Sequence, residues 1–242
     1  MRNLLANLLS RIDRSSAPAF AAPPDPASGP EGVILVHGLA RTDRSMRPLE
    51  KRLSSVGFRV HNLRYPSADL PPEELVANLR TQIADCCADA PRLHFVTHSL
   101  GGILVRAFLA DHPFSNLGRV VMLAPPNRGS ELVDVFAAWR LFQRVLGPTA
   151  VQLGTGPSSL PNRLPPPAFE FGVIAGTRSV NPVSRLVLPG ESDGRVSVES
   201  TRLPGMSDFI TVPISHPFIM QSDVTAGYGV EFLRHGRFRG RT

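Results

Sequence analysis

The chain of 242 residues is poor in cysteine and lysine and has no apolar run long enough to cross a bilayer. Its two cysteines, Cys86 and Cys87, are adjacent on an expected helix, which disfavours a mutual disulfide and lacks the spacing of metal ligands. Lys51 is the only lysine, so arginine carries nearly all of the positive charge behind a net charge of +6. No recognised nucleic-acid-binding motif or dense basic helix accompanies this charge, so we expect no nucleic acid partner.

Residues 1–30 differ in composition from the rest of the chain. Residues 2–14 place leucines on one face of an expected helix and arginines elsewhere, which suits either peripheral contact with a membrane or docking on the domain. Residues 17–30 are rich in alanine, proline and serine and are expected to be flexible. The apolar stretch is too short for a secretory signal, so we expect a cytoplasmic protein, and a peripheral membrane association stays open. Residues 31–242 contain no internal repeat and are expected to form one domain.

Strand-like and helix-like runs alternate along the chain, which predicts an α/β fold. In such a fold a mostly parallel central sheet is covered by helices on both faces. The expected strands are residues 32–36, 58–63, 92–97, 118–123, 170–175 and 208–214. The expected helices between and after them are residues 44–56, 72–88, 100–110 and 222–234.

A serine-glycine motif stands between an expected strand and an expected helix, in the stretch Thr97-His98-Ser99-Leu100-Gly101-Gly102. A serine at such a turn projects its hydroxyl from a strained corner, and the amides at the helix start can bind an anion. Gly101 and Gly102 let the helix pass close to the strand. The usual pattern has glycine two residues before the serine, where this chain has the bulkier Thr97. Ser99 is therefore the candidate nucleophile.

Two candidate partners, Asp193 and His216, follow Ser99 in the order serine, acid, histidine. His216 comes directly after a β-branched run that predicts the last strand, so its ring would lie at a strand's carboxyl end. The other histidine after Asp193 is His235, which lies in an arginine-rich tail. Asp193 is favoured as the acid because Asp-Gly suits a tight loop, although most such aspartates lie in solvated turns. The competing carboxylates are Glu191, Glu199 and Asp208.

An apolar run that ends in His-Gly-Leu, over residues 32–39, predicts a buried strand and a second part of the site. The backbone N–H groups of Leu39 and Leu100 are the candidate oxyanion hole, the pair of donors that binds the negative oxygen of a tetrahedral intermediate. Each such donor contributes about 3 kcal/mol. His37 and His98 are favoured as hydrogen-bonded structural residues over a role in proton transfer.

With these motifs in this order, residues 31–235 resemble the α/β-hydrolase superfamily, in particular small bacterial lipase-like and esterase-like members and inositol-deacylase-like relatives. The likeness also rests on the stretch Leu123-Ala124-Pro125-Pro126-Asn127-Arg128-Gly129-Ser130. The resemblance implies the α/β-hydrolase fold, a catalytic domain over residues 31–242, and no metal or organic cofactor. It implies that Ser99, Asp193 and His216 hydrolyse carboxylic esters, lipid-like or with other apolar acyl groups, through an acyl-serine intermediate.

Other activities remain open from the sequence. An acyltransferase or a thioesterase would use the same three side chains in the same order. The alternative of a different class is a protein of this fold that binds a ligand without reacting with it.

Residues 130–167 lie between two expected strands, where hydrolases of the resembled kind commonly insert a small helical cap. One helix with a wide apolar face is expected from Glu131 onward. Phe136, Trp139 and Phe142 on this face are the candidate substrate-binding residues, which would line an acyl-chain pocket. An apolar helical face is equally typical of an ordinary core contact, so both interpretations stay open here.

Overall fold

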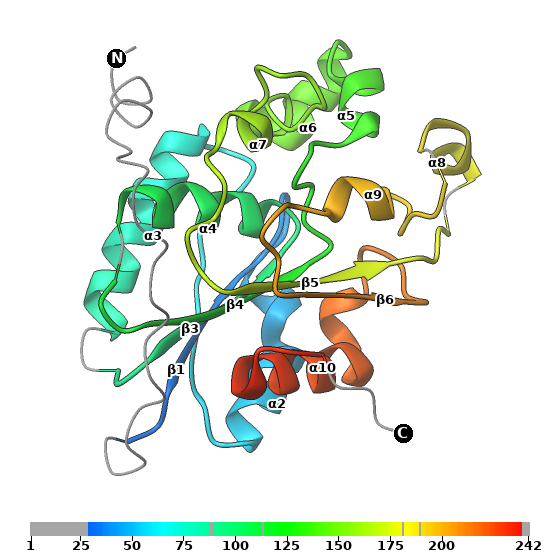
Figure 1. Ribbon diagram of the computed structural model, residues 1–242. Coiled ribbons are helices and arrows are strands. Elements are labelled where there is room, and N and C mark those ends of the chain that lie inside the picture. The colour runs from blue at the N-terminus through cyan, green and yellow to red at the C-terminus, as the bar shows by residue number, and fades with distance from the viewer. Residues whose placement is uncertain (1–28, 88–89, 113, 181, 189, 239–242) are drawn as a thin grey trace.

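The computed structural model describes residues 29–87, 90–112, 114–180, 182–188 and 190–238 (Figure 1). The amphipathic helix expected over residues 2–14 lies outside the described residues, as does most of the segment 17–30. None of the described helices is both long enough and apolar enough to cross a membrane.

The core of the molecule is a single six-stranded sheet in which every pair of neighbouring strands is parallel. The strand order is β2-β1-β3-β4-β5-β6, so the strands β1, β3 and β4 lie side by side at its centre. The strands are β1 (Gly32–Val36), β2 (Arg59–Asn62), β3 (Leu93–His98), β4 (Leu117–Leu123), β5 (Phe171–Gly176) and β6 (Asp208–Val212). Each strand lies within two residues of its predicted bounds, and the predicted α/β fold is confirmed.

The helices connect successive strands. The α-helices are α2 (Arg47–Ser55), α3 (Pro72–Cys87), α4 (Leu100–Asp111), α5 (Glu131–Phe136), α6 (Arg140–Ala150), α7 (Leu160–Arg163), α8 (Pro182–Val187), α9 (Val198–Thr201) and α10 (Asp223–His235). Two 3-10 helices, η2 (Asp43–Met46) and η3 (Ile219–Gln221), complete the described elements. The short helices α7, α8 and α9 are too brief to give a periodic apolar pattern, so the sequence does not predict them.

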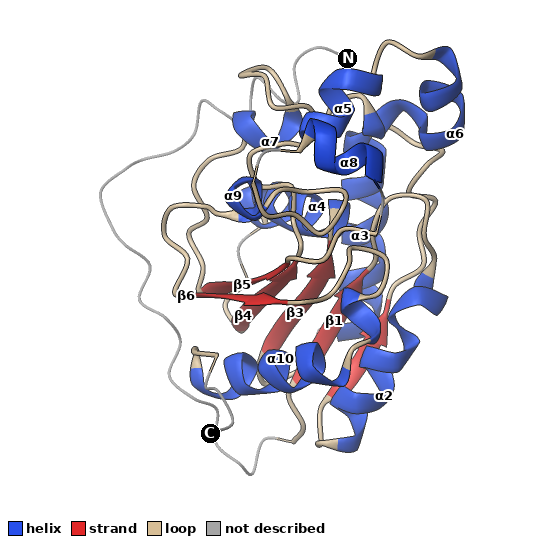
Figure 2. Cartoon of the chain, turned by 90° about the vertical axis from the view of Figure 1, so that its right-hand side faces the viewer, coloured by secondary structure: helices blue, strands red, loops and turns tan. Residues whose placement is uncertain are grey.

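Helices cover both faces of the sheet, as Figure 2 shows. Along β1 the side chains alternate: Val33 and Leu35 pack in a cluster with residues of α2 and α10, whereas Ile34 and Val36 pack with residues of α3 and α4. All four of these side chains are fully buried. A strand covered on both faces is apolar throughout, which explains why this run shows no alternation of polar and apolar residues.

Glycine at the start of α4 lets this helix pass against the end of β1. A side chain at Gly101 would place its Cβ atom 2.4 Å from the carbonyl oxygen of Val36 and 2.8 Å from that of His37. Real Cβ atoms do not approach backbone oxygens so closely, so any larger residue must push α4 away from the sheet. The position of this helix start therefore depends on the glycine.

The single long helix predicted from Glu131 is wrong, because the chain forms α5 and α6 with a break between them. Trp139, in the break, has extended backbone angles and precedes the first residue of α6. The side-chain amide of Gln143 donates to the carbonyl oxygen of Ala137, 2.7 Å away, and so satisfies a carbonyl group at the end of α5. The apolar spacing continues across the break, which is why the sequence pattern does not reveal it.

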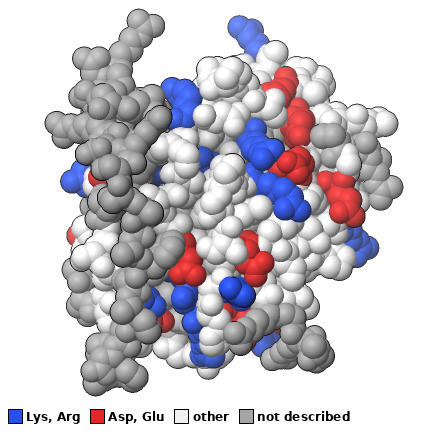
Figure 3. All heavy atoms as spheres, in the orientation of Figure 1, with Lys and Arg blue, Asp and Glu red and all other residues white. Residues whose placement is uncertain are grey.

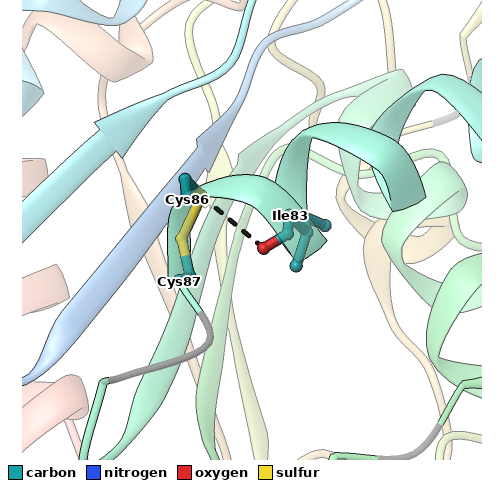
Figure 4. The surroundings of a disulfide bond; sticks show 3 residues. All are labelled: Ile83, Cys86 and Cys87. Carbon is teal, nitrogen blue, oxygen red and sulfur yellow. Dashed lines mark hydrogen bonds between the residues drawn. A yellow bond between two sulfur atoms is a disulfide. The ribbon is translucent and has the colours of Figure 1, made fainter.

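The expectation for the two cysteines is also wrong, since Cys86 and Cys87 form a disulfide (Figure 4). The prediction assumed a regular helix, in which adjacent side chains point away from each other, but this pair occupies the last two positions of α3. The imidazole of His61 on β2 lies within 4.8 Å of both sulfur atoms. Disulfide sulfur is not the thiolate that binds metal ions, so this group is no metal site in its oxidised form.

Charged side chains of both signs lie beside one another on the face shown in Figure 3. Among the ion pairs of the described residues, the one between Arg128 and Glu199 and the one between Arg119 and Glu170 each have a distance of 2.8 Å. No broad patch of one sign covers the described part of that face. The excess of arginine therefore does not gather there into a surface suited to nucleic acid.

The surroundings of Gly101 and Gly227 predict opposite effects on stability when each glycine is replaced by alanine. Gly101→Ala should lower the free energy of unfolding by about 3 kcal/mol, because the new Cβ atom overlaps the end of β1. Gly227→Ala is the matched control, because that position is exposed inside α10 and a Cβ atom there meets nothing within 4 Å. It should raise the same free energy by about 0.5–1 kcal/mol. Urea unfolding measures both, and equal effects of the two substitutions would refute the close approach of α4.

Candidate active site

Ser99 occupies a strained turn between β3 and α4. Its backbone φ is 52° and its ψ is −122°, a conformation that costs about 1–3 kcal/mol for a residue other than glycine. The amide of Ser99 donates to the carbonyl oxygen of Leu123 at 2.9 Å, which ties the turn to the end of β4. Thr97 is fully buried on β3, and the turn forms although glycine is the usual residue at that position.

The structure brings together the three side chains that the sequence order singles out. The Nε2 atom of His216 lies 3.0 Å from the hydroxyl oxygen of Ser99. On the other side of the same ring, Nδ1 lies 2.6 Å from Oδ2 of Asp193. Because an ionised carboxylate only accepts hydrogen bonds, Nδ1 is the donor, and Nε2 is left to accept the proton of the hydroxyl group.

The backbone of its own loop holds Asp193 in place. Its second oxygen, Oδ1, accepts hydrogen bonds from the amides of Arg195 and Val196 at 2.9 and 2.8 Å. The amide of His216 donates to the carbonyl oxygen of Asp193 at 3.0 Å, so the loops that carry the acid and the histidine are joined directly. Asp193 is 1% exposed and His216 is 5% exposed. Asp193 itself is therefore buried and hydrogen-bonded, unlike the aspartate of a solvated surface turn.

The competing side chains lie in other contacts. Glu199 pairs with Arg128 on the surface, and Asp208 accepts hydrogen bonds from backbone amides at the start of β6 and near the end of the described chain. Glu191 is exposed. His235 is an exposed residue of α10 and lies 3.9 Å from Glu231. None of these four residues lines the cavity at Ser99.

The two predicted oxyanion-hole residues flank the serine. Leu100 is the first residue of α4, where the amide has no partner inside the helix. Leu39 lies in the turn after β1 and lines the same cavity as Ser99. Among the loop and turn hydrogen bonds of the described residues, neither amide donates to a backbone carbonyl. Ala40, the residue after Leu39, has a φ of 52°, so this turn is strained as the serine turn is.

Two buried histidines support the site without touching the serine hydroxyl. The ring of His37 stacks on that of Tyr65 at 4.1 Å, and burial lowers the pKa of His37. The Nε2 atom of His98 donates to the carbonyl oxygen of His216 at 3.1 Å. Burial lowers the pKa of His98 well below its ordinary value, so its ring is neutral. These contacts agree with the interpretation of both residues as structural.

A cavity of about 200 Å³ opens beside the serine. Of the three predicted substrate-binding residues, Phe136 and Phe142 line it, but Trp139 does not and is 59% exposed. The break between α5 and α6 explains this correction, because Trp139 lies in extended backbone between the two helices. Its ring packs edge-on against that of Phe136, with 5.0 Å between the ring centroids, and does not line the cavity. Further lining residues that the sequence did not single out are Leu132, Val133, Leu146, Leu153, Arg41 and Arg195.

A second cavity, of about 430 Å³, is lined in part by Arg106 and Asn127 and by none of the three clustered side chains. Arg106 donates to the backbone carbonyls of Asn127 and Pro161 at 3.2 and 3.1 Å. Removal from water lowers the pKa of this buried guanidinium to about 10. Because Asn127 and Pro161 lie before and after the α5–α6 segment, Arg106 fixes both ends of that segment to α4.

A buried aspartate, a histidine and a serine at a strained strand-to-helix turn, all at the carboxyl edge of a parallel sheet, define the α/β-hydrolase class of proteins. Comparison with known families agrees. The chain belongs to the alpha/beta hydrolase family, whose model matches residues 33–220.

Individual relatives are similar over different parts of the chain. A triacylglycerol lipase of Burkholderia plantarii is 30% identical over 135 residues, which cover 51% of this chain and 37% of the lipase. The chain thus spans well under half of that relative. Lipase BlEst2 of Bacillus licheniformis, in its mature form, is similar in structure with a TM-score of 0.63 at 22% identity, covering 89% of this chain and 95% of the lipase. A metagenomic carboxyl esterase has a TM-score of 0.62 at 18% identity, covering 87% of this chain and 71% of the esterase.

The contact between His98 and His216 predicts a difference between two substitutions at residue 98. His98→Gln keeps a side-chain N–H donor, whereas His98→Leu leaves the carbonyl oxygen of His216 without its partner. We expect the leucine variant to unfold with a free energy about 1–3 kcal/mol lower than the glutamine variant. Urea unfolding of the two variants measures the difference. Equal stabilities would mean that this hydrogen bond does not hold the histidine loop.

Proposed function

We propose that this protein is a serine hydrolase that cleaves carboxylic esters with lipid-like or other apolar acyl groups. The observation that carries the proposal is the continuous hydrogen-bonded line from Ser99 through His216 to the buried Asp193. A serine hydroxyl is a weak nucleophile at neutral pH, and it needs a base within hydrogen-bond distance and a third group that orients the base. Both conditions are met in this line.

In the first step Ser99 attacks the ester carbonyl carbon while Nε2 of His216 takes the hydroxyl proton. Asp193 keeps the proton of Nδ1 on the ring and stabilises the imidazolium that forms. The amides of Leu39 and Leu100 stabilise the negative oxygen of the tetrahedral intermediate. His216 then gives its proton to the departing alcohol oxygen, which leaves the acyl group bonded to Ser99.

In the second step water replaces the alcohol. His216 takes a proton from the water as it attacks the acyl carbon, and the same two amides stabilise the second tetrahedral intermediate. Collapse of this intermediate releases the carboxylic acid, and the proton held by His216 returns to the oxygen of Ser99. The residues of this chain thus complete the cycle.

The lining of the cavity supports an apolar acyl group. Leu132, Phe136, Phe142 and Leu146 come from α5 and α6 and place apolar surface within the cavity that holds Ser99. The segment from α5 to α6 also carries exposed apolar side chains, which suit contact with aggregated lipid. These exposed residues are Val135, Trp139, Leu141 and Val145. The similarity to a triacylglycerol lipase over part of the chain supports the same class of substrate.

The nucleophile can be tested directly. A fluorophosphonate probe should label the wild-type protein at Ser99 and should not label Ser99→Ala, because only an activated serine attacks phosphorus. Ser99→Ala should also lower kcat for a p-nitrophenyl ester by roughly 10⁴-fold or more. Probe labelling read by mass spectrometry and initial rates measure the two effects.

Ser130→Ala is the matched control for the labelling. Ser130 lines the same cavity, but its hydroxyl donates to the carbonyl oxygen of Arg195 and has no base beside it. The control should be labelled as the wild type is. Folded wild-type protein that remains unlabelled would instead indicate a binding protein of this fold.

The acyl pocket predicts a chain-length effect that separates Phe142 from Trp139. Phe142→Ser should reduce the preference for long over short p-nitrophenyl acyl esters by roughly tenfold, because it removes apolar surface from the cavity. Trp139→Ser should leave the preference unchanged, since that side chain does not line the cavity. Ratios of kcat/KM along a series of chain lengths check both. A larger effect at residue 139 would contradict the proposed pocket.

A further inference from the structure

Two arginines line the cavity at Ser99, and the mechanism above does not use them. Arg41 lies two residues after Leu39, and Arg195 lies two residues after Asp193. Each is therefore fixed close to the reacting groups by a loop whose geometry the site already requires. Among the ion pairs of the described residues, neither guanidinium has a carboxylate partner within 4.0 Å.

The two positive charges act on each other and on the rest of the cavity. Partial removal from water, and after it the charge of Arg41, lowers the pKa of Arg195, whereas Asp193 raises it. The charges of Arg41 and Arg195 also contribute to the lowered pKa of His98 in the same cavity. The charge of Asp193 offsets only part of this effect, because removal from water and the charge of Arg41 outweigh it at Arg195. An anion bound between the arginines would relieve this repulsion.

The origin of the lining residues indicates which part of a substrate would carry such an anion. Five apolar lining residues come from α5 and α6, namely Leu132, Val133, Phe136, Phe142 and Leu146, whereas the arginines come from the loop after β1 and the loop before α9. An acyl chain is stabilised by the apolar residues, and an anionic group would lose hydration there without compensation. The alcohol part of the ester is then the part left for the arginines.

We propose that Arg41 and Arg195 form an anion subsite and that the substrate is an ester whose alcohol carries a phosphate group, such as a monoacyl glycerophosphate. This inference rests on the proposed ester hydrolysis at Ser99. The bond that breaks joins the acyl carbon to the glycerol oxygen, the proton from Ser99 passes through His216 to that oxygen, and glycerophosphate departs. Arginine suits this role because its planar guanidinium binds phosphate oxygens in pairs.

A matched pair of substrates tests the subsite. Octanoyl glycerophosphate and octanoyl glycerol have the same ester and the same acyl chain and differ only in the phosphate group. Wild-type protein should prefer the phosphate ester in kcat/KM by roughly tenfold, a modest factor because both arginines keep contact with water. The preference should fall as ionic strength rises.

Substitutions assign the preference to the two arginines. Arg41→Gln and Arg195→Gln should each reduce the ratio of the two kcat/KM values, and the double variant should bring it close to one. Arg44→Gln is the matched control, because Arg44 is an exposed arginine three residues from Arg41 that does not line the cavity, and it should keep the wild-type ratio. Arg41→Lys should retain part of the preference, since it keeps the charge and loses the paired hydrogen bonds.

A third substrate separates the alcohol side from the acyl side. A glycerol half-ester of a long dicarboxylic acid carries its negative charge at the end of the acyl chain. Preference for this substrate over octanoyl glycerophosphate would overturn the assignment, and so would equal rates on octanoyl glycerol and its phosphate. If the fluorophosphonate still labels Ser99 in that case, only the anion subsite fails and the ester hydrolase stands.

Binding can be measured without catalysis. An alkyl ether of glycerophosphate and the corresponding alkyl glycerol cannot be hydrolysed, and calorimetric titration into Ser99→Ala compares their affinities. The subsite predicts that the phosphate ether binds more tightly than the alkyl glycerol. This difference should disappear when Arg41→Gln and Arg195→Gln are added to Ser99→Ala, and the result does not depend on turnover. Equal binding of the two ethers would overturn it.

Discussion

The close passage of α4 against the end of β1 is the constraint on which the rest of the site depends. Gly101 leaves no room for a side chain between the helix and the carbonyl oxygens of Val36 and His37. This contact sets the first turn of α4, and with it the amide of Leu100, beside the turn that contains Leu39. The strained backbone of Ser99 joins β3 to this helix, and the serine hydroxyl lines the cavity.

Asp193 and His216 lie far from Ser99 in the sequence, and backbone hydrogen bonds between loops hold them beside it. Both come from loops at the carboxyl edge of the sheet, and the amide of His216 bonds directly to the backbone of Asp193. His98, the residue before the nucleophile, donates to the carbonyl oxygen of His216 on the opposite side. The backbone of the histidine loop is thus held from both directions, so the distance between Ser99 and His216 is set by backbone contacts as well as by their side chains.

The strands and the serine motif could be predicted from the sequence because both leave strong local patterns of residue types. The strands are continuous apolar runs bounded by turn residues, and the serine motif needs small residues at fixed positions, so both are readable without coordinates. At the break between α5 and α6 the side-chain amide of Gln143 donates to the carbonyl oxygen of Ala137, and the apolar spacing of the sequence continues across the break. The disulfide between Cys86 and Cys87 joins the last two residues of α3. Neither the break nor the disulfide corresponds to a recognisable pattern of residue types. Because the break is not visible in the sequence, the prediction that Trp139 lines the cavity is wrong.

The arginines at the cavity illustrate a further limit of sequence patterns. Arg41 and Arg195 are separated by much of the chain and stand among many other arginines, so nothing in their spacing distinguishes them. The fold selects them, because the loops that must supply Leu39 and Asp193 to the site also carry the next charged residues into the cavity. The like charges of Arg41 and Arg195 repel each other. An anion that binds between them reduces this repulsion and stabilises the folded protein. The geometry that serves the reaction thereby also determines which charge the site favours in a substrate.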